Sequence, residues 1–385
     1  MESLTGYLQQ VREQLHRQPE LAFEEHKTAA FVAEQLERLG FTVRRGVGKT
    51  GVVGLLQFAE SGPCAALRAD MDALPIAEET GVPYASENPG VMHACGHDTH
   101  MAIALACCAY FAEHKSKCRG AFMVIFQPAE EIVSGAEAML AEGVFSPVKP
   151  DVLFALHNWP QLPLGTLGIQ VGPITAFADR FQVVLRGRGG HGALPHTTRD
   201  PIAMAAAGVQ NAFTAVQRKC DPIRPRVLSF GKIHGGTSFN IIPEEVVLEG
   251  TVRTVSPEDR ESVIELLEGV FDAAAQMYGG THQLEYRRGV PAAVNDPAAC
   301  QRAVEVLRDR LPEVPVVTAG LASLIGEDVA YFLEQVPGVL MLFGTGRPDA
   351  VSELHNPRYL VPEEAVAVGW QAVQALLSSY LERQG

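Results

Sequence analysis

Two residues that can both bind a metal ion lie close together in the segment Met92–His100. Cys95 and His97 are separated by a single glycine, between expected strands and just before an apolar helix. A cysteine and a histidine two residues apart can reach one ion from a turn, and glycine lets the backbone bend there. The segment could instead be a loop that caps the helix through Asp98 or Thr99, with incidental histidines. The fragment by itself leaves both interpretations open.

A pair of acidic residues, Glu130 and Glu131, follows the apolar run Phe122–Phe126. Open α/β sheets place their ligand sites at this end of a strand. One carboxylate could bind a metal ion while the other takes a proton from metal-bound water. Such a pair can also be a solvated acidic start of a helix. Its position after a buried strand favours the chemical role.

Two histidines are expected in comparable places. His157 follows the apolar run Val152–Leu156, and His355 lies in a loop near the carboxyl end. One such histidine is more often a structural hydrogen-bonding residue than a ligand. Taken together, however, the four clusters supply enough ligands for two ions. The side chains expected to converge are Cys95, His97, Glu130, Glu131, His157 and His355.

A further acidic residue, Asp72, comes just after the β-rich run Ala65–Leu67, within the segment Arg68–Pro75. A carboxylate here could accept the second N–H of a ligand histidine and fix its tautomer, as carboxylates often do behind a metal-bound imidazole. As an isolated motif the segment is a turn at a strand end. We expect Asp72 to support the site through such a histidine.

The elements that must position these residues form two folding units. Outside residues 179–290, helical and β-rich patterns alternate, which predicts an α/β fold with a mixed central sheet flanked by helices. The expected elements are a helix in Met1–Arg17, a helix Thr28–Leu39, strands Val52–Phe58 and Ala65–Leu67, a helix after His100, strands Phe122–Phe126, Val152–Leu156 and Gly338–Phe343, and a helix Glu363–Leu381. The sheet is expected to take strands from both ends of the sequence.

Residues 179–290 follow a different order, which predicts an inserted β-α-β-β-α-β, ferredoxin-like domain. Its expected elements are strand Phe181–Leu185, helix Asp200–Gln217, strands Val227–Ile233 and Val246–Val252, helix Pro257–Met277 and strand His282–Tyr286. The expected organisation is therefore residues 1–178 and 291–385 as one domain, interrupted by 179–290.

Composition excludes several classes of protein. The 385 residues are 47% hydrophobic and carry a formal net charge of −14 without a basic run, which argues against a nucleic-acid partner. The seven cysteines are scattered and imply no disulfide framework. The amino-terminal segment lacks the features of a signal peptide, and no apolar stretch approaches the roughly 20 residues of a membrane span. We expect a cytoplasmic protein without a membrane partner.

Six motifs in the order RADMDALP, MHACGHD, QPAEE, LHNWP, GGHGALPH and LHNP resemble the hippurate hydrolase and auxin-conjugate hydrolase branch of the two-metal aminoacylase and carboxypeptidase family. The similarity runs from about residue 15 to about residue 357. It implies two divalent ions per subunit with Cys95 bridging them, and the donor types leave the metal open among zinc, manganese, nickel and cobalt. The remaining ligands that it implies are His97, Glu131, His157 and His355, and Glu130 falls in the place of the general base.

The resemblance also gives roles to the inserted domain, as a catalytic lid or dimerisation domain. His191 resembles the loop histidine that reaches the active site of the dimer partner and polarises the scissile carbonyl, and Asn240 and Arg253 resemble the groups that hold the substrate carboxylate. By themselves these residues could equally be a glycine-rich hairpin, a turn amide and a solvated charge. The implied protein is a homodimer or homotetramer that hydrolyses N-acyl amino acids, hippurate-like or N-acetyl, with metal-activated water.

The sequence departs from this branch at Thr99, at Ile132–Gly135 and at Gly326–Val329, which leaves the acyl group open. Within enzymes, the alternatives are a dipeptidase or a deacetylase of the N-acetyl-diaminopimelate type. From another class, the alternative is a non-catalytic, metal-stabilised dimer that binds a ligand. Glu130 beside Glu131 argues against that last alternative, because metal binding alone needs no spare base.

Overall fold

The computed structural model describes residues 4–348 and 353–383. It divides into two compact units, described separately below: unit 1 comprises Met1–Ile174, Ala293–Ala322 and Asp328–Gly385, and unit 2 comprises Thr175–Ala292 and Ser323–Glu327. Unit 2 contains the whole segment 179–290 that the sequence pattern assigns to an inserted domain.

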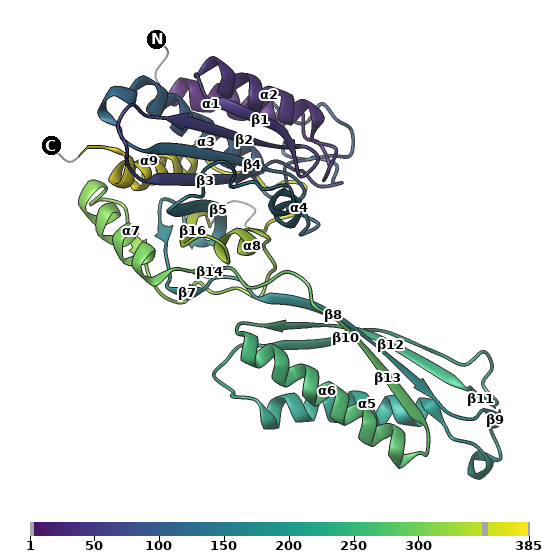
Figure 1. Cartoon of the computed structure of the whole chain (residues 1–385). Helices are drawn as coiled ribbons and strands as arrows, with labels where there is room; N and C mark the ends of the chain where they lie inside the picture. The colour runs from purple at the N-terminus through teal and green to yellow at the C-terminus, as the bar shows by residue number, and fades with distance from the viewer. Residues whose placement is uncertain (1–3, 349–352, 384–385) are drawn as a thin grey trace. The chain divides into compact units, whose positions relative to one another are not determined.

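Unit 1 is built on an eight-stranded mixed sheet, with strand order β1-β2-β4-β3-β5-β16-β6-β15 (Figure 1). The strands are β1 (Thr42–Val47), β2 (Gly51–Gln57), β3 (Cys64–Asp70), β4 (Ala121–Gln127), β5 (Val152–Pro163), β6 (Leu167–Gly168), β15 (Val316–Val317) and β16 (Gly338–Gly346). The central strands β4, β3, β5 and β16 run parallel to one another, whereas β1, β2 and β4 pair antiparallel. The predicted mixed α/β sheet, with strands from both ends of the sequence, is confirmed.

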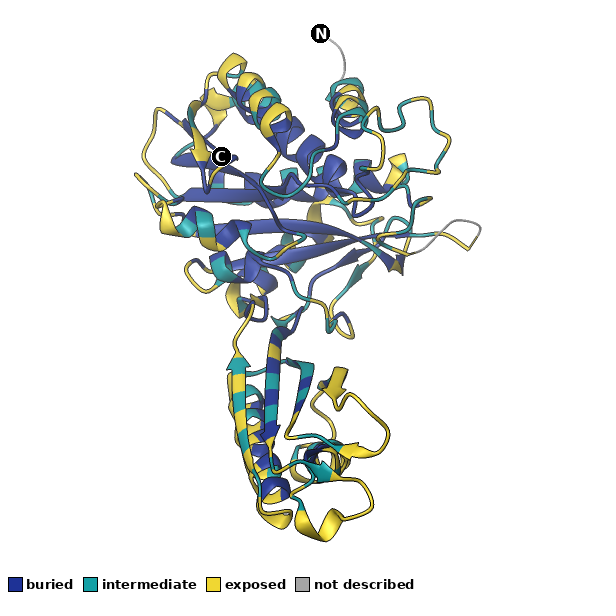
Figure 2. Ribbon diagram, turned by 90° about the vertical axis from the view of Figure 1, so that its right-hand side faces the viewer, coloured by how far each residue is buried: buried dark blue, intermediate teal, exposed yellow. Residues whose placement is uncertain are grey.

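Helices cover this sheet and bury its central strands (Figure 2). They are α1 (Leu4–Arg17), α2 (His26–Arg38), α3 (His97–Glu113), α4 (Gly135–Ala141), α7 (Pro297–Arg310), α8 (Val329–Leu333) and α9 (Glu363–Leu381). Every residue of β3 and of β4 is buried, which accounts for their continuous apolar runs. Helix α3 packs against α1 and α9, and its burial on nearly all sides explains its uniformly apolar composition.

Two sequence expectations in unit 1 need adjustment. The helix expected after His100 begins at His97, so the segment with the candidate ligands Cys95 and His97 is partly inside α3. His157 was expected at the end of a strand, but β5 continues to Pro163 because it keeps pairing with β16 beyond the polar residues. The helix expected in Met1–Arg17 is α1, and residues 1–3 lie outside the described residues.

Unit 2 contains a four-stranded antiparallel sheet with strand order β10-β12-β8-β13. Its main elements are β8 (Phe177–Arg186), α5 (Pro201–Lys219), β10 (Val227–Gly235), β12 (Glu245–Thr254), α6 (Pro257–Met277) and β13 (Thr281–Arg287). Helices α5 and α6 pack together against the sheet and bury Phe271, Leu267 and Val183. The predicted β-α-β-β-α-β arrangement is confirmed.

The caps of the two unit 2 helices follow from their sequences. The side chain of Asp200 accepts hydrogen bonds from the N–H groups of Ile202 and Ala203 at the start of α5, and Ser256 accepts one from Asp259 at the start of α6. A proline occupies the first turn of each helix, where its fixed φ is already helical.

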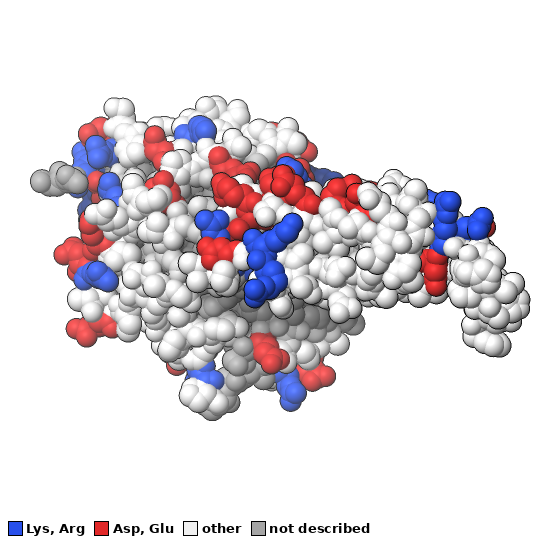
Figure 3. All heavy atoms as spheres, turned by 90° about the horizontal axis from the view of Figure 1, so that it is seen from below, with Lys and Arg blue, Asp and Glu red and all other residues white. Residues whose placement is uncertain are grey.

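The remaining elements are short: the 3-10 helices η1 (Lys115–Lys117) and η2 (Pro195–Thr197), and strands β7 (Gly172–Pro173), β9 (Gly190–His191), β11 (Ile241–Ile242) and β14 (Val294–Asn295). Among the described residues, none of the helices combines the length and the apolar character needed to cross a bilayer. Figure 3 shows both acidic and basic side chains on the face that it draws.

Candidate metal centre

The first group of candidate ligands is Cys95, His97 and His157, whose ligand atoms all lie within 4.8 Å of one another. Cys95 precedes α3, His97 is its first residue, and His157 lies inside β5. The sulfur of Cys95 is 3.5 Å from Nε2 of His157. All three side chains are buried, so a cation bound here would be shielded from bulk water.

Gly96 allows Cys95 and His97 to face the same point. Its φ is +83°, a left-handed conformation that side chains rarely adopt, and a Cβ there would lie 2.5 Å from Oδ1 of Asn158. The spacing recognised in the sequence therefore depends on glycine for both its backbone conformation and its packing.

The second group is Cys95, Glu131 and His355, again with ligand atoms within 4.8 Å of one another. Nε2 of His355 lies 3.4 Å from Oε2 of Glu131. The backbone N–H of His355 donates to the carbonyl of Ala94 at 3.0 Å, which ties the carboxyl-terminal loop to the segment that carries Cys95. The five ligands expected from the sequence thus form two groups that share Cys95, the residue expected to bridge two ions.

Hydrogen bonds orient two of the candidate ligand histidines. Nδ1 of His97 donates to the carbonyl oxygen of Asp72 at 2.8 Å, and Nδ1 of His157 donates to the carbonyl oxygen of Asn158 at 2.8 Å. Each ring therefore presents the lone pair of Nε2 to the centre, the arrangement of a metal-bound imidazole. Nε2 of His97 and Oε1 of Glu131 are buried and have no hydrogen-bond partner.

A divalent cation fits these observations. Buried polar atoms without partners are rare in folded proteins, and a cation in each group would satisfy one of them, Nε2 of His97 in the first group and Oε1 of Glu131 in the second. One thiol, three imidazoles and one carboxylate are a donor set suited to first-row transition ions. The residues present therefore fit the metal that the donor pattern implies.

The charges around the centre also favour a bound cation. Burial, with the carboxylates of Glu131 and Glu130, raises the pKa of the Cys95 thiol well above its usual range. Burial by itself would lower the pKa of His97, but Asp70, Asp72 and Glu131 outweigh it and raise that pKa to about 10. This concentration of carboxylates attracts a cation, and a bound ion would displace the protons from the thiol and from the imidazole.

Asp72 organises the turn that carries the paired glutamates. Its Oδ1 accepts the N–H of Glu130 at 3.0 Å and its Oδ2 accepts the N–H of Glu131 at 2.9 Å. The contact is possible because β3 and β4 are parallel neighbours whose ends lie side by side. The turn is strained, since Ala129 and the β-branched Val133 have φ values of +52° and +50°.

The expected role of Asp72 changes in one respect. Its carboxylate was expected to accept the N–H of a ligand histidine, but its backbone carbonyl does so for His97. The carboxylate, 3.5 Å from Nδ1 of His97 at its nearer oxygen, is committed to the two glutamate N–H groups. Asp72 therefore bonds both the candidate ligand His97 and the backbone of the acidic pair.

Sequence reasoning missed a buried polar network behind the centre. Nδ1 of His100 lies 2.6 Å from Oδ1 of Asp70, and Nε2 of His100 lies 2.7 Å from Oδ1 of Asn158. The buried Arg68 binds Oδ2 of Asp70 at 2.6 Å and Oδ1 of Asp328 at 3.3 Å. The signal was present, because His100 is three residues after His97 on a helix and so lies on the same face.

Asp70, His97 and His100 form another group with ligand atoms within 4.8 Å. Asp70 and His100 already pair with each other and with Arg68 and Asn158. We therefore assign them to the support of the centre rather than to the ligand set.

The three residues expected to act from the inserted domain lie in unit 2. His191 is exposed on β9 and pairs with Ile241 of β11, and the carbonyl of Asn240 accepts the N–H of Gly192 at 2.9 Å. His191 and Asn240 are therefore neighbours. Arg253 lies on β12, where burial lowers its pKa, and it donates to the hydroxyl of Thr251.

Comparisons with known proteins agree with the fold and with the centre. The family described as "Peptidase family M20/M25/M40" matches residues 66–379. An N-acetyl-L-cysteine deacetylase of Bacillus subtilis is 38% identical over 92% of this chain and 84% of its own length. An N-acyl-L-amino acid amidohydrolase of Geobacillus stearothermophilus is 40% identical over 78% of this chain and 82% of its own length.

Among solved structures, the YXEP protein of Bacillus subtilis, described as a dinuclear metal binding peptidase from the M20 family, superposes with a TM-score of 0.85. It is 34% identical, and the match covers 98% of each chain. The fold and the clustered ligands define this protein as a metal-dependent amide hydrolase. The chain belongs to peptidase family M20/M25/M40, within its aminoacylase and amidohydrolase members.

Proposed function

We propose that this protein hydrolyses the amide bond of N-acyl amino acids, releasing a carboxylic acid and a free amino acid. The observation that carries the proposal is the pair of ligand groups sharing Cys95, with the buried Glu130 beside them. The names of two relatives, an N-acyl-L-amino acid amidohydrolase and an N-acetyl-L-cysteine deacetylase, support this class of substrate.

Each ligand group would hold one divalent ion. Cys95, His97 and His157 would hold the first, and Cys95, Glu131 and His355 the second. When bound, such ions supply a water molecule of lowered pKa and polarise the amide carbonyl. Thiol and imidazole ligands suit zinc, nickel and cobalt, while the carboxylate also accepts manganese.

Glu130 is the general base in this proposal. Its Oε2 lies 3.9 Å from Nε2 of His97, so it borders the ligand cluster. The carboxylate takes a proton from the attacking water and then delivers it to the leaving amine. The two N–H bonds from Glu130 and Glu131 to Asp72 hold the backbone of the pair in place while this proton moves.

Unit 2 completes the site as a lid and dimerisation domain, spanning residues 179–290 and inserted into a catalytic domain of residues 1–178 and 291–385. His191 of a second subunit would polarise the scissile carbonyl, and Asn240 and Arg253 would hold the substrate carboxylate. A homodimer or homotetramer is supported by β10, an edge strand whose unpaired backbone groups can bind a second strand. Ile233 on that strand is 60% exposed.

We also place the protein in the cytoplasm. All seven cysteines are free in the described structure, as is usual for proteins of a reducing compartment.

A substrate panel tests the proposal. N-acetyl, N-benzoyl and indole-acyl amino acids, dipeptides and an N-acetyl-diaminopimelate would be assayed with manganese, zinc, nickel or cobalt. We expect the highest kcat/KM on one class of N-acyl amino acid. A preference for dipeptides or for the diaminopimelate would support the rival hydrolases, and ligand binding without any turnover would support a non-catalytic dimer.

A further inference from the structure

The chain between β3 and α3, residues 71–96, contains neither a helix nor a named strand. Asp72 lies at its beginning and Cys95 at its end, so its path sets the position of part of the metal centre. Irregular segments of this length are uncommon in compact domains unless they have a function. Contacts with the rest of unit 1 must therefore hold it.

One such contact is made by His16 on helix α1. The residue is 2% exposed, with Nδ1 2.9 Å from Oδ2 of Asp98 and Nε2 3.2 Å from Oε1 of Glu78. A carboxylate can only accept hydrogen bonds, so both ring nitrogens donate when the imidazole is protonated. A single buried cation thus joins α1, the irregular segment and the first turn of α3.

Each of the two carboxylates connects His16 to a further part of unit 1. Oε2 of Glu78 accepts the N–H of Ser86 at 2.6 Å, and the hydroxyl of Thr80 donates to Oε1 of the same residue. The Glu78 side chain therefore holds residues 78 and 86 together within the irregular segment. Asp98, on the other side, directly follows the ligand His97 in α3.

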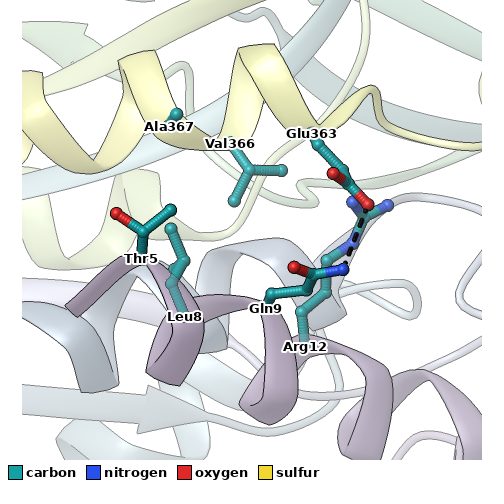
Figure 4. A pocket seen from close by; sticks show the side chains of 7 residues that line it. All are labelled: Thr5, Leu8, Gln9, Arg12, Glu363, Val366 and Ala367. Atoms are coloured by element: carbon teal, nitrogen blue, oxygen red, sulfur yellow. Dashed lines mark hydrogen bonds between the residues drawn. The ribbon is translucent and has the colours of Figure 1, made fainter. Parts of the chain in front are cut away.

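Arg12 supports Asp98 from the same helix. Its Nε lies 3.4 Å from Oδ2 of Asp98, and one terminal nitrogen donates to the carbonyl of Val361 at 2.7 Å. Figure 4 shows Arg12 on α1 opposite Glu363 at the start of α9, where Gln9 bonds to Glu363. Helix α1 is thus bonded through Arg12 to Asp98 and to the chain just before α9.

We propose that His16 is a positioning residue for the metal centre, which sets the affinity for metal ions by holding Asp98 and the segment 71–96 in place. The inference rests on the proposed function, since it concerns the same metal centre. His16 contacts neither a candidate ligand nor substrate in this role. Without it, the buried Asp98 and the partly buried Glu78 lose the cation between them, and the repulsion displaces Asp98 together with His97.

His16→Gln tests this, because glutamine carries no charge and has both of its N–H donors on one nitrogen, so it cannot reproduce the two opposed donors of the imidazolium. His282→Gln is the matched control. His282 also lies between two carboxylates, 3.0 Å from Glu268 and 3.8 Å from Asp272, but in unit 2. Both variants and the wild type would be stripped of metal and titrated with cobalt(II), following the thiolate-to-cobalt absorption from Cys95.

We expect His16→Gln to bind cobalt about 10-fold more weakly than the wild type, the lower end of the range for losing a residue bonded to a metal ligand, because His16 acts through Asp98. Amide hydrogen exchange across residues 71–96 of the metal-free protein should also be faster. His282→Gln should match the wild type in both measurements. Equal cobalt affinity in His16→Gln and the wild type, or an equal loss in the control, would overturn this inference alone.

Two further outcomes are decisive. Should His16→Gln fail to fold, Glu78→Gln, which removes only the charge on the side of the segment, is expected to give a smaller loss of affinity in the same direction. Unchanged affinity in that variant would overturn the inference. A wild type that binds no cobalt would overturn the proposed function and, with it, this inference.

Discussion

The sulfur atom of Cys95 lies 3.5 Å from Nε2 of His157, although 62 positions separate the two residues in the sequence. One comes from the loop before α3 and the other from inside β5. They meet because α3 packs on β3, which pairs with β5 in parallel. The contact joins two members of the first candidate ligand group.

Glu130→Gln should lower kcat by about 10²–10⁴-fold, because the amide cannot take a proton from the attacking water. The variant should still bind metal, since Glu130 is outside both ligand groups that share Cys95. Steady-state kinetics and elemental analysis of the same samples check this. Glu34→Gln, on the exposed side of α2, is the control, and an undiminished rate for Glu130→Gln would remove it from the role of base.

Asp72→Ala should lower the free energy of unfolding by about 2–4 kcal/mol, because the N–H groups of Glu130 and Glu131 lose their acceptors. Asp72→Asn keeps one acceptor oxygen and should lose less. Urea denaturation of the metal-free proteins separates the stability effect from metal binding. An unchanged free energy of unfolding in Asp72→Ala would show that the strained turn keeps its conformation without the Asp72 carboxylate.

Arg68→Met should destabilise the fold by about 3–5 kcal/mol, because the buried carboxylates of Asp70 and Asp328 lose their shared cation. Arg38→Met, which breaks the exposed pair with Glu34, should change the stability by at most about 1 kcal/mol. Thermal and urea unfolding compare the two variants. Similar small effects would show that the buried network contributes little to stability.

The stability contributed by His16 should depend on pH. Burial by itself would lower its pKa, but Asp98 and Glu78 outweigh burial and raise the pKa to about 9 from the ordinary 6.5. The other charged or titratable groups that face this cluster are Arg12, Tyr84 and His93. Because the pKa is raised in the folded state, protonated His16 stabilises the fold fully below about pH 6.5, and this is lost as pH rises through about 9.

The difference in unfolding free energy between the metal-free wild type and His16→Gln should therefore shrink by about 3 kcal/mol between about pH 6 and about pH 10. Urea denaturation at several pH values measures it. A difference that stays constant or grows with pH would contradict the assignment of a protonated imidazole between two carboxylates.

Much of this architecture could be predicted because it depends on residues that are close together in the sequence. Helix α9 has the predicted bounds, Glu363–Leu381, since its apolar spacing and its proline before the first turn are unambiguous. The ligand residues could be proposed because cysteine, histidine and paired glutamates after buried strands are uncommon together. Periodicity and residue type carry such information without any knowledge of distant contacts.

The supporting residues could not be predicted in the same way. His16 gains its role from Asp98 and Glu78, 82 and 62 positions away, and nothing in the residues around it marks that contact. The strand β5 runs past His157 because β16 pairs with it there, which is a tertiary effect. For Asp72, the sequence predicted a contact with a histidine but not that the carbonyl would make it.

The central claim is that five side chains, distant in sequence, hold two ions with Cys95 common to both. Metal content after equilibrium dialysis of the stripped protein against manganese, zinc, nickel or cobalt tests it most directly. The account predicts two equivalents per chain in the wild type and a loss of both high-affinity sites in Cys95→Ala. Fewer than one equivalent of every ion in the wild type, or two tightly bound equivalents in Cys95→Ala, would contradict it.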